Sequence, residues 1–200
     1  MSTARDLALV ALGLPPDRAV EQGDLSLALA GAEAVDLLES GALSLDGDHM
    51  VPGPLVATGD RLLDQAAASL VRREPYETVE DWLWRHGRGL AAAYADDLER
   101  AGLVAHPPGH GFRLRFARTV PADSQERRGA EERRLSGEPV LAALTAAAGI
   151  GEDPSDAGEN LTGDAVTTVV AAVGDVVTQL EAVRLRLEIE NAAFDNIWRA

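Results

Sequence analysis

The sequence predicts a mainly α-helical protein, and three observations lead to this prediction. Apolar residues recur three and four positions apart along most of the chain. Several of these segments begin at a Ser, Thr or Asp that can cap a helix and end at Gly or Pro. Only two stretches, residues 42–52 and 103–117, have the turn residues or the alternation of a β-hairpin.

The elements are expected in a simple order. The first helix is capped by Thr3, and the second starts near Asp24 and has one apolar face. A hairpin that turns at Asp46-Gly47 follows. Later helices are capped by Thr58 or Asp60 and by Thr78. The expected helices of this first part cover about residues 3–14, 24–40, 60–70, 78–88 and 90–101.

Composition divides the chain into three parts. Residues 1–150 are expected to form one compact helical domain. Residues 151–163 are rich in acid, Gly and Pro and predict a flexible loop. Residues 164–200 predict a long helix whose stripe, including Leu180, Val183 and Leu187, packs on the domain or on a second copy.

Charge and composition exclude several classes of function. The formal net charge of −15 disfavours nucleic acid, because binding it depends on neutralising phosphates. The chain has no cysteine and therefore no disulfide or thiolate metal site. No secretory signal or apolar run of roughly 18 residues is recognised, so a cytoplasmic protein is expected. All basic residues are arginine, which suggests GC-rich coding.

No set of residues predicts catalysis, a metal site or a cofactor. The "TGD" at 58–60 opens a helix as a phosphate loop would, but such a loop needs a lysine and the chain has none. His106 and His110 are separated by Pro-Pro-Gly, so they do not share a helix face. We therefore expect no enzyme and no cofactor.

One basic patch lies beside aromatic residues. Trp82 fits the core, whereas Trp84 cannot share its face, and Arg85 and Arg88 follow closely. On chemistry alone, a solvated helix end with cations near its carboxyl end explains this patch better than a binding surface does. A helix and hairpin at 90–118 also resemble a winged helix, although its acidic helix disfavours nucleic acid.

The order of several sequence blocks resembles the Golgi phosphoprotein 3 family. These blocks are "DLALVALG", "ALAGAEAVDLLESGALSLDG", "TGDRLLDQA", "ETVEDWL" and "DDLERAGLV". The resemblance implies a compact helical domain with short hairpins. It also implies a non-enzymatic peripheral adaptor, because eukaryotic members bind phosphatidylinositol 4-phosphate on Golgi membranes and hold glycosyltransferase tails.

The resemblance places a headgroup site between the start of the second helix and the end of the Trp84 segment. Of the family's four headgroup contacts only Arg88 matches, and Glu21, Ala30 and Ala91 stand at the other three positions. The expected site is therefore a degraded one, formed by Arg88, Arg85 and Trp84.

The resemblance implies a bacterial-type family member that lies in the cytoplasm or peripherally on the cytosolic face of a membrane. Its expected partners are an anionic phospholipid headgroup and a protein or second copy bound through the C-terminal helix. The alternative functions are a helical protein-interaction scaffold without lipid binding and, ranked last, a winged-helix nucleic-acid binder.

Overall fold

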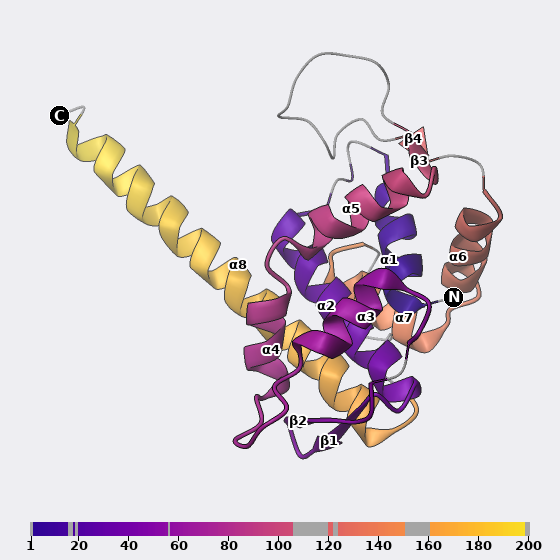
Figure 1. The fold of residues 1–200 in the computed structure, drawn as a ribbon. Helices are drawn as coiled ribbons and strands as arrows, with labels where there is room; N and C mark the ends of the chain where they lie inside the picture. The colour runs from indigo at the N-terminus through magenta and orange to yellow at the C-terminus, as the bar shows by residue number, and fades with distance from the viewer. Residues whose placement is uncertain are drawn as a thin grey trace.

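The computed structural model describes residues 2–15, 18, 20–55, 57–105, 120–121, 124–150 and 161–198. Within these residues the protein is mainly α-helical, which confirms the predicted fold class (Figure 1). The helices are α1 (Thr3–Leu12), α2 (Gln22–Glu39), α3 (Arg61–Ser69), α4 (Val79–His86), α5 (Leu90–Arg100), α6 (Gln125–Leu135), α7 (Pro139–Ala147) and α8 (Asp164–Trp198). The strands are β1 (Leu43–Asp46), β2 (His49–Pro52), β3 (Val104–Ala105) and β4 (Val120–Pro121).

The strands form two antiparallel pairs, β1 with β2 and β3 with β4. In the first pair Asp46 faces His49, so Gly47 and Asp48 make the loop and the turn lies one residue later than predicted. Gly47 has a φ of 62°, which suits glycine. In the second pair Val104 faces Pro121. The arm expected at 112–116 lies outside the described residues.

Helix α2 lies at the centre of the fold. The prediction gave it a single apolar face, but every residue from Asp24 to Leu37 is buried. Helices α1, α3, α4, α5, α7 and α8 all contact it, so no side of this segment is left for water. Its alanine-rich sequence makes this possible, because small side chains let several neighbouring helices approach closely.

Helix α1 is fixed to α2 at its amino end. The structure corrects its cap: Ser2, not Thr3, accepts the hydrogen bond from the backbone of Arg5. The Thr3 and Ala4 amides instead donate to the Asp36 carboxylate, at 2.8 and 3.1 Å. Burial raises the pKa of Asp36 to about 6, against the opposing effect of these two amides.

Two predicted caps take the expected role. Asp60, one of the two candidates, accepts hydrogen bonds from the amides of the first turn of α3. Thr78 accepts one from the Asp81 amide at the start of α4. These side chains supply acceptors that the first turn of a helix otherwise lacks.

Helix α8 begins on the domain and then leaves it (Figure 1). Its first part lies against α2, α4 and α7, with Val169, Val173 and Val176 fully buried. Gly31 of α2 allows this close approach, because a Cβ at Gly31 would overlap Val173 Cγ2. The later part projects away from the other helices, and there Val183 and Leu187 are each 53% exposed.

Part of α8, Asp164–Asn191, is long and apolar enough to cross a membrane, with a hydropathy of 1.4. The sequence analysis found no such run, because Asp175 and Glu181 interrupt the apolar residues. In the structure Val169, Val173 and Val176 of this segment are buried, but only 22% of the apolar window is buried in all. One helix of this kind is weak evidence for a membrane span.

Two glycine substitutions test the docking of α8. We expect Gly31→Ala to lower the free energy of unfolding, since overpacking costs about 1–3 kcal/mol, more than the gain of up to about 1 kcal/mol in helix propensity. Gly174→Ala in α8 is the matched control, because nothing lies within 4 Å of its added Cβ. Urea denaturation followed by circular dichroism measures both. A Gly31→Ala protein as stable as the control would contradict this packing.

Candidate functional site

The turn after α4 is held against the start of α2, where the sequence analysis placed the headgroup site. The Ala91 amide donates to Ser26 Oγ at 3.1 Å. Gly87 packs so closely that a Cβ there would lie 3.3 Å from the Ser26 carbonyl oxygen. The two elements are therefore in direct contact. Gly89, with a φ of 74°, completes the turn on the other side of Arg88.

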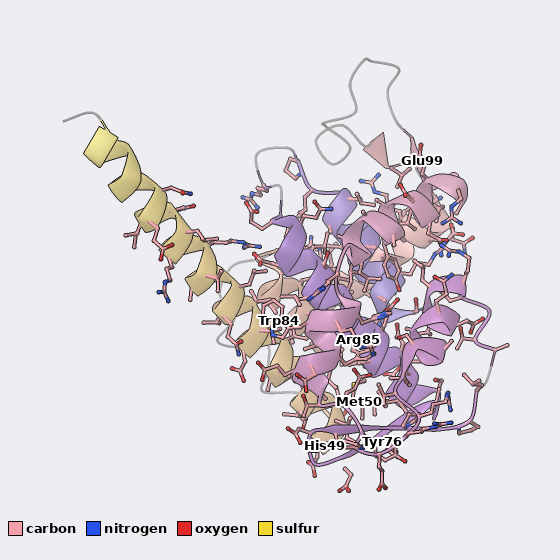
Figure 2. All side chains as sticks on the ribbon, turned by 60° about the vertical axis from the view of Figure 1, so that its left-hand side comes forward. His49, Met50, Tyr76, Trp84, Arg85 and Glu99 are labelled. Carbon is pink, nitrogen blue, oxygen red and sulfur yellow. The ribbon has the colours of Figure 1, made fainter. Side chains whose placement is uncertain are left out.

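The three predicted site residues are in very different surroundings. Arg88 is exposed and makes no hydrogen bond or ion pair among the described residues. Arg85 is bound by both oxygens of Glu77, at 3.0 and 2.6 Å, and by the Ser69 carbonyl. Trp84 is half-buried on the side of α4 next to α8, with Arg85 on the side away from it (Figure 2). The Arg88 guanidinium is thus available to a ligand, whereas the Arg85 guanidinium is already bound by Glu77 and Ser69 of the same chain.

Acidic groups and a second arginine lie at the start of α2. Glu21 is exposed and its side chain caps nothing. Asp24 forms an ion pair with Arg184 of α8 at 2.9 Å, while its buried Oδ1 has no hydrogen-bond partner among the described residues. An unpartnered carboxylate oxygen favours a hydrogen-bond donor over an anion. The carboxylates at the start of α2 are therefore matched with Arg184 and add no donor for an anion.

Sequence reasoning missed Arg184. It lies four residues after Leu180, and both side chains cover Gly23 of α2. The spacing of Leu180 and Arg184 could have placed them on one side of the helix. The partner, 160 positions earlier, carries no signal in the sequence.

A buried polar network lies beneath this surface. His86 Nε2 is 2.6 Å from Glu33 Oε2, and the Tyr94 hydroxyl donates to Glu33 Oε1 at 2.9 Å. Burial raises the pKa of Glu33, and the hydrogen bonds from His86 and Tyr94 offset this only in part. Trp82 stacks on the His86 ring, with centroids 4.5 Å apart. The network thus joins α2, α4 and α5.

Ser69 extends the network without making it a catalytic triad. Its Oγ lies 3.3 Å from His86 Nδ1 and also 2.8 Å from the Ala66 carbonyl, to which it donates. Ser69 is the last residue of α3, not the exposed turn that carries a hydrolase nucleophile. Glu33 is fully buried between neighbouring helices. The contacts among Ser69, His86 and Glu33 thus hold α3, α4 and α2 together.

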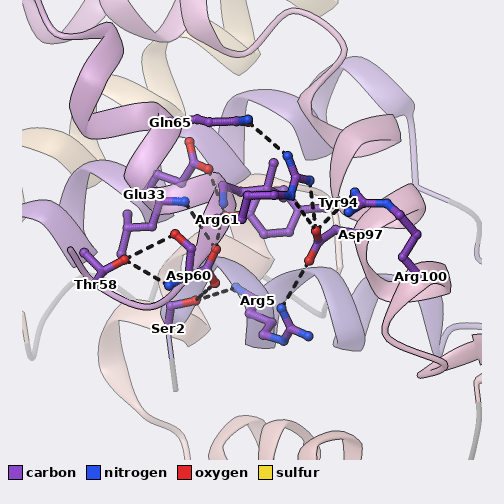
Figure 3. Close-up of polar contacts among 12 residues, drawn as sticks. Ser2, Arg5, Glu33, Thr58, Asp60, Arg61, Gln65, Tyr94, Asp97 and Arg100 are labelled. Atoms are coloured by element: carbon purple, nitrogen blue, oxygen red, sulfur yellow. Dashed lines mark hydrogen bonds and ion pairs between the residues drawn. The ribbon is translucent and has the colours of Figure 1, made fainter.

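The "TGD" block is also structural (Figure 3). Thr58 binds the Asp64 carboxylate at 2.8 Å, and Asp60 caps α3. Arg61 pairs with Asp97 of α5 at 2.9 Å, and Arg5 of α1 pairs with the same carboxylate at 3.3 Å. The block therefore connects α3 to α1 and α5.

Among the described residues, no three His, Asp or Glu side chains gather closely enough to hold a metal ion. What distinguishes the molecule is a helical domain built round a buried helix, which begins beside an exposed arginine. The chain belongs to the Golgi phosphoprotein 3 (GPP34) family, whose sequence model matches residues 4–185. No curated protein matches it. The match includes the docked part of α8 and ends where the helix projects.

The network around Glu33 can be tested with paired tyrosine variants. Tyr94→Phe leaves a buried carboxylate oxygen without its donor, and we expect the free energy of unfolding to fall by about 1–3 kcal/mol. Tyr76→Phe is the control, because the half-exposed Tyr76 makes no hydrogen bond through its hydroxyl among the described residues. We expect that change to stay within about 0.5 kcal/mol. Equal effects of the two substitutions in chemical denaturation would refute the role of Tyr94.

Proposed function

We propose that the protein is a non-enzymatic peripheral adaptor that binds an anionic phospholipid headgroup weakly. The observation that carries this proposal is the exposed Arg88, held by Gly87 and Gly89 against the start of α2 in a member of the Golgi phosphoprotein 3 family. A guanidinium is well suited to a phosphate group. The protein would lie in the cytoplasm and bind reversibly at the cytosolic face of a membrane.

The free energy that Arg88 can contribute favours weak binding of the headgroup. A charge-assisted hydrogen bond contributes about 1.5–3 kcal/mol. Arg88 alone supplies one or two such bonds, because Arg85 is held by Glu77. Glu21 lies at the same surface, and the net charge of −15 repels an anionic bilayer. We infer that the headgroup contact assists an adaptor and does not anchor it alone.

Sedimentation with liposomes that contain phosphatidylinositol 4-phosphate tests this proposal. We expect slight binding that decreases with added salt, because exposed charges are screened. Arg88→Ala should abolish it, whereas Arg73→Ala should not, because Arg73 is an exposed arginine on the loop before α4. Tight binding that Arg88→Ala leaves unchanged would place the site elsewhere. No binding at low salt would favour the scaffold described next.

A second function, a helical interaction scaffold, is supported by one continuous stripe on α8. Its members are spaced alternately four and three residues apart, as in a coiled coil: Val169, Val173, Val176, Leu180, Val183 and Leu187. The first three are buried on the domain, and the last two are exposed beyond it. The same face that binds α2 is thus unpartnered in the projecting part.

Charge selects a second copy of this chain, in antiparallel orientation, as the occupant of the exposed stripe. Arg186 precedes Leu187, and Glu188 and Glu190 follow it, whereas Arg184 is already paired with Asp24. Two such helices that cross antiparallel at Leu187 place the basic segment of one beside the acidic segment of the other. Parallel helices would place like charges together, which is destabilising.

Light scattering of the full-length chain over a range of concentrations tests the antiparallel pair. We expect a dimer for the wild type and a monomer for Val183→Glu/Leu187→Glu, because two charges then interrupt the apolar stripe. Leu185→Glu/Ile189→Glu is the matched control, since these exposed residues lie on the opposite side of α8. A monomeric wild type, or two variants that behave alike, would refute the pairing.

A further inference from the structure

A cleft lies on elements separate from the headgroup position. It has a volume of about 970 Å³ and is formed where the end of α1 meets α6 and the end of α7. This is at the upper end of the range of small-molecule sites, about 300–1,000 Å³. Its lining is Leu9, Val10, Gly13, Leu14, Pro15, Arg18, Arg127, Arg128, Glu131, Arg134, Gly149 and Ile150.

The cleft is positive in a strongly acidic protein. Its lining holds four arginines and one glutamate, a net formal charge of +3, whereas the whole chain carries −15. The carboxyl ends of α1 and α7 also lie there, and each contributes about half a negative charge. A positive charge of about two units remains. The cleft therefore attracts anions.

Two of these arginines are available to a ligand. Arg134 is bound by both oxygens of Glu131, at 3.1 and 2.6 Å. Arg18 and the half-buried Arg127 make no side-chain hydrogen bond or ion pair among the described residues. Arg133 of the same helix points into the domain and pairs with the buried Asp6. Helix α6 thus directs Arg133 toward Asp6 in the domain interior and Arg127 toward the cleft.

The other side of the cleft is apolar. Leu9 and Val10 of α1 and Ile150 after α7 are buried side chains that form this wall, and Leu14 is half-buried beside them. An inorganic anion would contact the arginines and not this wall. A ligand with one anionic end and one apolar end would cover both sides.

We propose that the cleft binds an amphipathic phosphate monoester. The phosphoryl group lies between Arg127 and Arg18, because the planar guanidinium fork matches phosphate oxygens. The apolar part lies against Leu9, Val10 and Ile150. The site belongs to α1, α6 and α7, and it does not depend on Arg88 or on the proposed headgroup contact.

Isothermal titration calorimetry of the full chain with hexyl phosphate tests this proposal. We expect saturable binding that is at least about a hundredfold weaker in Arg18→Ala/Arg127→Ala, since each of the two lost charge-assisted contacts corresponds to about a factor of ten. Inorganic phosphate should bind more weakly than hexyl phosphate, and uncharged hexanol should not bind. Arg73→Ala, which changes an exposed arginine outside both proposed sites, should leave the affinity for hexyl phosphate unchanged.

Three outcomes overturn the proposal: no binding of hexyl phosphate to the wild type, equal affinity in the double variant, or inorganic phosphate binding as tightly as hexyl phosphate. Thermal melts of the double variant show whether it is folded. If it is not, hexyl phosphate must still raise the melting temperature of the wild type where hexanol does not, or the proposal fails.

Vesicles that contain phosphatidic acid separate the two sources of such a ligand. Sedimentation that the double variant loses supports a membrane lipid. Binding of hexyl phosphate without sedimentation supports a soluble phosphate ester. Arg88→Ala tests the headgroup contact and the double variant tests the cleft, and because the two sites share no residue the two proposals can fail independently.

Discussion

The fold depends on the burial of α2, a helix that carries three carboxylates into the core. Each carboxylate is bound by a different element. Asp36 accepts two amides of α1, Glu33 contacts His86 of α4, and Asp24 pairs with Arg184 of α8. A buried charge that loses its partner costs about 3–5 kcal/mol. These contacts therefore fix which helix lies against which part of α2, where apolar packing alone is not directional.

The same constraint explains how the family's fold can be kept whatever the surface binds. The blocks that resemble the family act in the fold: Asp60 and Arg61 connect α3 to its neighbours, and Trp82 stacks on His86 inside the network. These residues stabilise the fold whether or not a ligand is bound. The surface above them can change without loss of the fold, as Glu21 at the expected tryptophan position illustrates.

Local patterns in the sequence were sufficient for α1 to α5 and α8, for the Asp60 and Thr78 caps and for the first hairpin, because each depends on residues within one or two turns. Helix α6 was not predicted, because its sequence has almost no large apolar residues from which to read a helical period. Contacts between distant residues were not predictable. Glu33 and His86 lie 53 positions apart, and nothing near either residue identifies the other. The cleft was missed for the same reason. "QERRGAEERRL" is a charged stretch nearly devoid of large apolar residues, and only its position beside α1 gives Arg127 an apolar wall to face.

Because the projecting end of α8 is long, a small rotation of its docked part moves the tip over a larger distance. The helix is continuous from its buried valines to Trp198, so the part after Glu181 extends about 25 Å from the domain. A rotation of about 10° at the anchor would displace the tip by about 4 Å over that length. The helix leaves the domain where Leu180 and Arg184 cover Gly23, and its earlier close contact is that of Val173 with Gly31. The direction of the tip is therefore set by how closely α8 packs on two small residues of α2.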